Sequence, residues 1–389
     1  MFPGVLVRRR QFLRQAVALT AGAAWLRAAR SEAAPGSRVL ETRTISLDDR
    51  VYHGWPTLTR RKNGDLWVVY SGGREQHVCP FGRVDLMVSH DEGQTWGWPR
   101  TLLDTDLDDR DAGVVETAQG TMLVSTFTSL AYEAGLAAAQ HRGNWPPERL
   151  RRWQAAHQRL SAEQRKWELG VWIIRSTDGG RTWSPRQASL VNSPHGPIQL
   201  ANGRLLYAGK ELWSERQRVG VCESLDDGQS WRWLAELPAR AGDQPANYHE
   251  LHAVECLSGR LVVQIRNHNP ANANETLQSE SADGGRTWST PHEIGVWGLP
   301  SHLLRLADGR LLMTYGYRRV PFGNQARVST DEGRTWSGAI TISADGGSGD
   351  LGYPSTVELR DGTLVTVWYE ALPGRPFAVL RQARWKLDT

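Results

Sequence analysis

The sequence predicts an all-β fold, a six-bladed β-propeller of four-stranded antiparallel blades with a helical insertion in the second blade. A turn motif recurs five times, and a second polar-Gly turn recurs six times between short β-type runs. The 389 residues include 39 Gly and 18 Trp but only 6 Phe, which indicates many tight turns and one recurrent Trp role. A chain of this length can form two or three domains, but a propeller uses it in one.

The first 34 residues have the pattern of a twin-arginine export signal. Arg9-Arg10 precedes Phe12, an apolar stretch covers residues 16–26, and small residues near Ala34 suit cleavage. The stretch is too short and too rich in Ala for a stable membrane span. We therefore expect a bacterial protein exported to the periplasm or beyond, with no span in the mature chain. The alternative is a basic amphipathic helix on the surface.

The charge balance excludes a nucleic-acid binder. The chain has 46 basic and 42 acidic residues, but residues 1–34 alone hold six Arg and one Glu. The remaining body is close to neutral, whereas nucleic-acid binding needs a basic surface. Three Cys cannot build a disulfide scaffold, because one must stay unpaired.

The first repeat is the string Ser-x-Asp-x-Gly-x-Thr/Ser-Trp, which suits a β-turn between two strands. Its Asp caps backbone N–H groups, its Gly takes a positive φ, and its Trp packs under the turn. We therefore interpret this motif as structural and not catalytic. The five copies begin at Ser89, Ser176, Ser224, Ser281 and Ser329.

The second repeat is a polar-Gly hairpin turn, with its Gly residues separated by 56, 83, 56, 50 and 53 positions. One hairpin, a third strand, the Asp turn and a fourth strand make one propeller blade. The last blade lacks the Asp turn, so a strand from Arg38 to Leu47 is expected to close the ring beside the C-terminal strands. The six turns are Asn63-Gly64, Gln119-Gly120, Asn202-Gly203, Ser258-Gly259, Asp308-Gly309 and Asp361-Gly362.

The interval of 83 is about thirty residues longer than a blade needs. The excess, about residues 131–168, contains a segment from Glu148 to Trp167 that is rich in Arg, Gln, Ala and Leu and predicts a helix with a helical or irregular lead-in. A disordered loop is the alternative. The insertion joins strands two and three of the second blade, so we expect it on the active face, as a lid.

Residues 35–389 form the predicted propeller. Its topology indicates which of the two faces carries the functional site. The start of strand one and the end of strand two share a face, opposite the Asp turns, and the inner strands crowd the axis. Polar groups converging at a concave end make the default site hypothesis. The strand starts bring His53, Trp55, Arg110, Asp111, His195, Glu250, His252, His302 and Tyr353, and the returning ends add Arg74, Glu75, His77, Arg266 and Arg318.

Over about residues 38–389 these motifs resemble the sialidase (neuraminidase) superfamily of propellers with Asp-box, or BNR, repeats. The resemblance implies a retaining exo-glycosidase acting on a terminal sialic acid or related acidic sugar. Gly352-Tyr353-Pro354-Ser355-Thr356 is similar to the family's Tyr motif, which makes Tyr353 the expected nucleophile and Glu250 its base. Arg266, 16 residues after Glu250, and Arg318 or Arg319 are expected to bind the substrate carboxylate.

Two family features are missing. The segment that usually carries the first Arg reads His53-Gly54-Trp55-Pro56, so Arg74 or Arg110 is the candidate replacement. The loop after strand two of blade one, residues 74–82, has no Asp. Glu75, His77 or Asp111 is then the candidate proton donor. Trp55 is a candidate for stacking on a sugar face.

The inner face is also unusually rich in His, which leaves other functions open. His53, His77, His195, His252 and His302, with a Tyr, suit a polysaccharide lyase or a uronate-linkage hydrolase. A non-catalytic glycan-binding propeller is a further alternative. Because His53, His77 and Cys79 lack a metal-ligand spacing, we expect no metal and no cofactor. The expected partner is a carbohydrate, and the expected state is a monomer.

Overall fold

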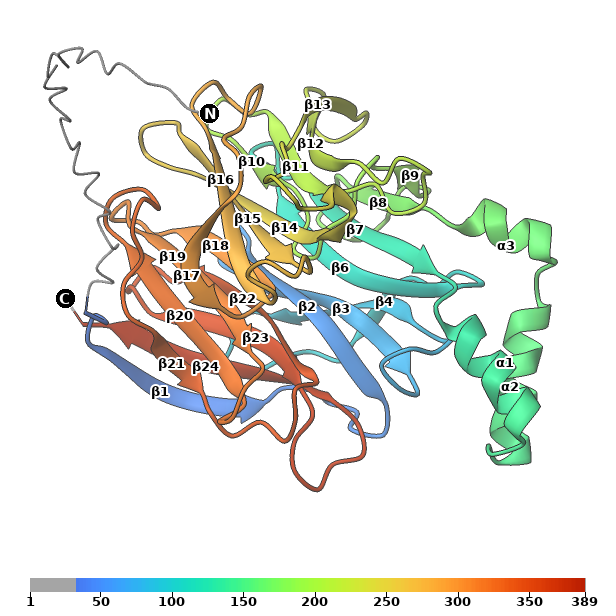
Figure 1. Ribbon diagram of the computed structural model, residues 1–389. Coiled ribbons are helices and arrows are strands. Elements are labelled where there is room, and N and C mark those ends of the chain that lie inside the picture. The colour runs from blue at the N-terminus through green and yellow to red at the C-terminus, as the bar shows by residue number, and fades with distance from the viewer. Residues whose placement is uncertain (1–32, 389) are drawn as a thin grey trace, which may run out of the picture. The chain divides into compact units, whose positions relative to one another are not determined.

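The computed structural model describes residues 33–388, so the predicted export signal lies almost entirely outside the described residues. Six four-stranded antiparallel sheets follow one another along the chain, which confirms the six-bladed propeller (Figure 1). Among these residues, no helix combines the length and apolarity that crossing a bilayer requires.

Blades one to five each run outward from an inner strand in chain order. Blade one comprises β2 (Tyr52–Arg60), β3 (Leu66–Arg74), β4 (Arg83–Ser89) and β5 (Arg100–Leu103). Blade two comprises β6 (Asp108–Glu116), β7 (Met122–Ser129), β8 (Val171–Ser176) and β9 (Gln187–Ala188). Blade three comprises β10 (Ile198–Gln199), β11 (Leu205–Lys210), β12 (Val219–Ser224) and β13 (Arg232–Glu236).

The second half of the ring repeats this order. Blade four comprises β14 (Tyr248–Glu255), β15 (Leu261–Asn267), β16 (Glu275–Ser281) and β17 (His292–Trp297), preceded by a short 3-10 helix, Pro245–Asn247. Blade five comprises β18 (Ser301–Arg305), β19 (Leu311–Tyr317), β20 (Gly323–Ser329) and β21 (Ile340–Ser343). Blade six comprises β22 (Leu351–Glu358), β23 (Leu364–Glu370), β24 (Val379–Leu387) and β1 (Ser37–Thr44).

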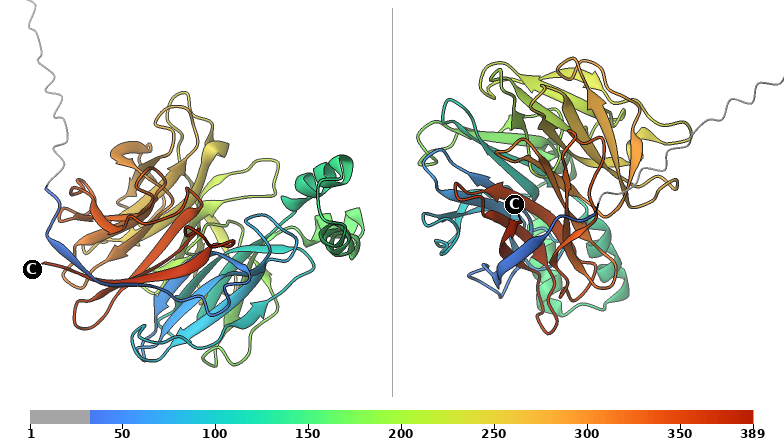
Figure 2. Two further views of the ribbon diagram at one scale, coloured as in Figure 1. Left: turned by 90° about the horizontal axis from the view of Figure 1, so that it is seen from below. Right: turned by 90° about the vertical axis from the view of Figure 1, so that its left-hand side faces the viewer.

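The ring closes as predicted, with an N-terminal strand on the C-terminal blade. β1 pairs antiparallel with β24, and the blue and red strands lie side by side in Figures 1 and 2. The outer strand of blade six therefore comes from the other end of the chain, which explains why this blade has no Asp turn. The pairing also covers a sheet edge that would otherwise stay open.

The Asp turns are held by local hydrogen bonds. In the first copy, Ser89 Oγ donates to Asp91 at 2.7 Å and accepts from Gly93 N at 2.8 Å. Asp91 then accepts from both the backbone N and the hydroxyl of Thr95, at 2.8 and 2.6 Å. Because each bond joins residues at most four apart, the motif specifies its turn without help from the rest of the fold.

The insertion between β7 and β8 contains three helices, α1 (Tyr132–Arg142), α2 (Pro147–Gln158) and α3 (Ala162–Glu168). They lie outside the ring in Figure 2 (left). The single helix expected from Glu148 to Trp167 is divided in two. Ser161 and Gln164 form a capping box that starts α3 and separates it from α2.

Candidate active site

Five inner-strand starts carry a side chain on a left-handed backbone. A β-bulge interrupts the ladder at this point in blades one, two, four and six. A bulge re-aims a side chain, and a positive φ in a residue other than Gly costs energy that the surrounding fold must supply. The five residues are Trp55 (φ 53°), Asp111 (46°), His195 (74°), Glu250 (41°) and Tyr353 (52°).

Tyr353, Glu250 and Arg266 meet at the axis from blades six and four. The Tyr353 hydroxyl donates to Glu250 Oε1. Arg266 Nη1 lies 2.5 Å from Glu250 Oε2 and 3.2 Å from the Tyr353 hydroxyl. Arg266 Nε also donates to His268 Nε2 at 2.8 Å. A phenol, its acceptor carboxylate and a cation thus form one connected cluster.

Electrostatics keep the Tyr353 phenol protonated and the Glu250 carboxyl ionised at rest. Burial, followed by the charge of Glu250, raises the pKa of Tyr353 well above its usual range. Burial alone would raise the pKa of Glu250 as well. The positive charge of Arg266 and the hydrogen bond from Tyr353 outweigh burial and lower it. The carboxylate is therefore ready to accept the phenol proton.

Arg318 extends the cationic side of the cluster. Its Nε donates to Leu351 O at 3.0 Å, and its guanidinium lies 5.9 Å from the centre of the Tyr353 ring. Arg266 and Arg318 both line a cavity of about 240 Å³. The neighbouring Arg319 instead stacks on Trp297 at 3.7 Å. Of the two adjacent arginines, Arg318 is the one beside the phenol.

Asp111 and Arg110 approach the same cluster from blade two. Burial raises the pKa of Asp111 to about 7, with Arg110 lowering it and Glu250 raising it. Within residues 33–388 the Asp111 Oδ1 atom has no hydrogen-bond partner. The Arg110 guanidinium lies 4.3 Å from the centre of the Trp55 ring. This side of the axis therefore supplies a second carboxyl and a third guanidinium.

His77 belongs to a polar network that sequence reasoning did not find. Its Nδ1 lies 2.9 Å from Asp350 Oδ1 and 2.9 Å from the Tyr52 hydroxyl. Tyr52 and Tyr369 both donate to Asp350, at 3.0 and 3.1 Å. His77, Tyr52 and Asp350 line a cavity of about 440 Å³. Asp350 lies in the loop just before the Tyr353 motif, and that position was its only signal in the sequence.

The His77 network lies next to the Tyr353 cluster, and the Trp55 ring packs against both. Trp55 packs edge-on against His77 at 5.0 Å and against Tyr353 at 6.4 Å between ring centres. Burial would raise the pKa of Asp350, but hydrogen bonds from His77 and Tyr52 outweigh it and lower the pKa. Asp350 is therefore an ionised carboxylate in contact with an imidazole.

Glu75 anchors the helical insertion and takes no part in this network. Its carboxylate accepts from Trp153 Nε1 at 2.9 Å and from Arg152 Nε at 3.1 Å. Arg149 of the same helix, α2, donates to Gln76. The insertion is thus docked on the loop that carries His77.

Three predicted substrate contacts are corrected by the structure. Trp55 is 1% exposed with the Arg74 and Arg110 guanidiniums against its ring, so it has no face for a sugar. Arg74 is fully buried in an ion pair with Asp108 at 2.5 Å, which prevents it from replacing the missing arginine. His53 is 4% exposed and its Nδ1 bonds Ser46 Oγ at 2.9 Å, so the ring is not available to a substrate.

His195, His252 and His302 form one buried cluster that is not open to a ligand. Their rings are 4.6 to 5.4 Å apart, and each side chain is at most 7% exposed. Burial lowers the pKa of His252 to about 3 and the pKa values of His195 and His302 well below 6.5. Neutral, buried rings do not suit the substrate contacts predicted for them.

No group of three or more His, Cys, Asp or Glu side chains within residues 33–388 is arranged to hold a metal ion. Cys79, Cys222 and Cys256 are free thiols and are all buried.

The six blades and the repeated Asp turns define an Asp-box propeller. A family model described as a BNR repeat-like domain matches residues 143–366. This match covers more than half of the chain, so the chain belongs to that family.

Two curated relatives are sialidases at low identity. The sialidase of Micromonospora viridifaciens is 27% identical over 215 residues, which are 44% of this chain and 31% of that protein. The sialidase of Bacteroides fragilis (strain YCH46) is 25% identical over 345 residues, which are 81% of this chain and 59% of that protein. The chain thus spans less than two thirds of either relative.

Solved structures share the fold. A protein of unknown function from Dyadobacter fermentans DSM 18053 has a TM-score of 0.73 at 23% identity and covers 91% of this chain and 100% of its own. A Hadza microbial sialidase has a TM-score of 0.64 at 18% identity and covers 88% of this chain and 68% of its own. At these identities the likeness concerns the architecture alone.

Proposed function

We propose that this protein is a sialidase-type exo-glycosidase that hydrolyses a terminal sialic acid or related acidic sugar with retention. The observation that carries the proposal is the hydrogen bond from the Tyr353 hydroxyl to Glu250, with Arg266 bonded to both groups. A buried phenol on a strained bulge, paired with an ionised carboxylate, suits an activated nucleophile.

In the first step, the Tyr353 oxygen attacks the anomeric carbon while Glu250 takes the phenol proton. The glycosidic C–O bond breaks, and the leaving oxygen receives a proton. Water then attacks the anomeric carbon of the covalent intermediate, and the bond from that carbon to the Tyr353 oxygen breaks. The proton of the water passes to the group that acted as acid, and Glu250 returns its proton to the Tyr353 oxygen. A phenol suits an anionic sugar, because a carboxylate nucleophile would be repelled by the substrate's own charge.

We assign the proton donor to His77, held by Asp350. The His77 side chain is 48% exposed and lines the 440 Å³ cavity, whereas Asp111 is buried. The ionised Asp350 carboxylate contacts Nδ1 at 2.9 Å, which holds the imidazole ring in place at the cavity. This pair replaces the Asp that the blade-one loop lacks.

The substrate carboxylate is assigned to Arg266 and Arg318, since both line one cavity beside Tyr353. Two planar guanidiniums can hold a carboxylate through charge-assisted hydrogen bonds. The third contact is assigned to Arg110, whose guanidinium lies 3.8 Å from Asp108, whereas Arg74 is fully buried and paired with the same Asp108 at 2.5 Å. The buried His195, His252 and His302 give no support to a His-based lyase.

The test uses an aryl glycoside of a nine-carbon acidic sugar as substrate. Tyr353→Phe and Glu250→Gln should each lower kcat by about 10²-fold or more, because each removes a group used in the covalent step. A fluorinated substrate should trap an adduct on Tyr353, which mass spectrometry of peptides locates.

Tyr70→Phe is the matched control, since Tyr70 is a buried phenol outside the site. Unchanged turnover in the Tyr353→Phe variant would contradict the nucleophile. An unsaturated, ultraviolet-absorbing product would instead identify a lyase. Binding of acidic glycans without turnover in the unmodified protein would identify a glycan-binding propeller.

A further inference from the structure

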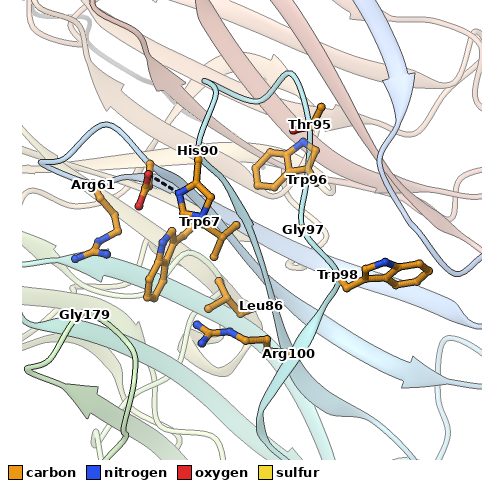
Figure 3. Close-up of a pocket in the computed structure, with 12 residues that line it drawn as sticks. Arg61, Trp67, Leu86, His90, Thr95, Trp96, Gly97, Trp98, Arg100 and Gly179 are labelled. Carbon is orange, nitrogen blue, oxygen red and sulfur yellow. Dashed lines mark hydrogen bonds and ion pairs between the residues drawn. The ribbon is translucent and has the colours of Figure 1, made fainter.

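A large cavity of the described chain lies away from the axial cluster. It has a volume of about 550 Å³ and is formed around the Asp turn of blade one, next to Gly179 from the Asp turn of blade two (Figure 3). Its walls come from β3, β4 and β5 and from the first hairpin turn. Because the Asp turns and first hairpin turns lie opposite the strand starts, this groove opens on the face opposite the catalytic cluster.

Tryptophan side chains form the apolar part of this groove. Trp98 lines the groove and is 73% exposed, so its ring is open to a ligand. Trp67 lines the groove and is 2% exposed, and its indole N–H has no acceptor among residues 33–388. An exposed aromatic ring and a buried, unpaired N–H donor in one groove suit a ligand with one apolar face and hydroxyls at its edge.

Charged side chains line the same groove, and some are paired while one makes no ion pair. Arg61 is fixed, since it pairs with Glu116 at 2.9 Å and stacks on Trp67 at 4.8 Å. Asp65 accepts from the exposed His90 at 2.8 Å, shown as the dashed line in Figure 3. Arg100 makes no ion pair within the described part of the chain, so its guanidinium is available for an anion.

We propose that this groove is a second carbohydrate site that binds a sugar ring of an acidic glycan, with Trp98 stacking on the ring and Arg100 contacting a carboxylate. The groove's lining contains a single carboxylate, Asp65, and no Tyr or Cys nucleophile, so it binds without hydrolysis. Such a site holds a polymeric or clustered substrate at the protein while the opposite face acts on its ends, and effective concentration raises avidity.

The experiment follows Trp98 directly, by ¹⁹F NMR of protein labelled with 5-fluorotryptophan. Its resonance is assigned from the Trp98→Phe variant, and the probe is a hyaluronan tetrasaccharide, with neutral cellotetraose as comparison. We expect a saturable shift of the Trp98 resonance with a Kd at or below about 1 mM. Trp98→Ala and Arg100→Ala should each weaken binding, measured by calorimetry, about tenfold or more.

Trp167→Ala is the matched control, since Trp167 is 78% exposed on α3, far along the chain from the groove. No Trp98 shift with the acidic probe would overturn the proposal. An equal shift with the neutral probe would overturn the acidic class. A shift that depends only on protein concentration would show a second copy of the chain as the occupant. Because the readout is local to Trp98, its failure is separate from any failure of catalysis at Tyr353.

Discussion

Strained residues mark the start of five of the six inner strands. Tyr353, Glu250 and Asp111 adopt φ values of 52°, 41° and 46°, where side chains other than Gly are disfavoured. In an unbroken strand, alternate residues would point to opposite faces. The bulge aims the residue at the axis instead, and the packed ring holds it there. The strain is thus a cost of bringing side chains from three blades together.

At the residue scale, the proposed role of His77 as proton donor predicts a loss of rate that depends on the leaving group. Replacing His77 with Ala should lower kcat/KM about 10²-fold or more for a natural disaccharide, whose leaving alcohol needs a proton. An aryl glycoside should be affected much less, because its phenolate leaves without one. Steady-state rates on both substrates measure the difference.

His141→Ala is the control, since His141 is an exposed histidine on α1. Asp350→Asn keeps the shape but removes the charged partner of His77 Nδ1, so kcat/KM on the natural disaccharide should also fall more than on the aryl glycoside. Equal losses on both substrates in His77→Ala would contradict the donor role.

At the scale of elements, the insertion stabilises the loop that holds His77. Trp153 of α2 is 1% exposed, packs against Phe81 and Tyr132, and donates to Glu75. A small apolar cluster of Cys79, Tyr132, Leu136 and Trp153 supports this contact. The helices are therefore a fixed support of the blade-one loop in this structure, and their role as a moving lid stays a prediction.

Trp153→Ala should release the insertion without unfolding the propeller. Losing a buried Trp costs about 3–5 kcal/mol, here confined to one peripheral cluster. Hydrogen exchange should rise over residues 131–168 and in the 75–82 loop, and kcat should fall. Trp167→Ala removes an exposed Trp from the same insertion and should change neither. Unchanged hydrogen exchange in Trp153→Ala would contradict the role of Trp153 in holding the insertion on the 75–82 loop.

At the scale of the whole molecule, the axis is packed with uncharged histidines. His195, His252 and His302 come from blades three, four and five, and His252 stacks on His302 at 4.6 Å. Burial is the largest cause of their lowered pKa values, and for His195 and His302 a neighbouring histidine adds to it. Protonation of this cluster would place charges in the centre of the ring.

The sign of the resulting pH dependence follows from proton binding. The unfolded histidines take up protons near pH 6.5, whereas the folded ones stay neutral down to about pH 3 in the case of His252. Stability should therefore be full above pH 6.5 and fall as the pH drops, by about 1.4 kcal/mol per pH unit for each such histidine.

Urea unfolding at several pH values measures this slope. A His302→Asn variant should lose stability at neutral pH but show a shallower decline between pH 6.5 and 4, because one proton-binding group is gone from the unfolded chain. His141→Asn, at an exposed position, should keep the original slope. A variant slope equal to that of the unmodified protein would contradict the account.

The sequence by itself determined the blades. The Asp turns and polar-Gly hairpins are specified by residues at most a few positions apart, so their repetition predicts six sheets and the strand that closes the ring. The strand starts also predicted the face on which Tyr353, Glu250 and Arg266 meet. These inferences succeed because turn chemistry and strand direction are local properties.

Only the tertiary structure decided which polar groups at that face are available. Asp350 meets His77 across 273 residues, and Arg74 is taken by Asp108 on the next blade. Trp55 and His53 stand at a strand start, where substrate contacts were predicted, but both side chains are buried. The reason is physical: a bulge changes where a side chain points, and a long-range ion pair removes a charge from the surface, and neither depends on neighbours along the chain.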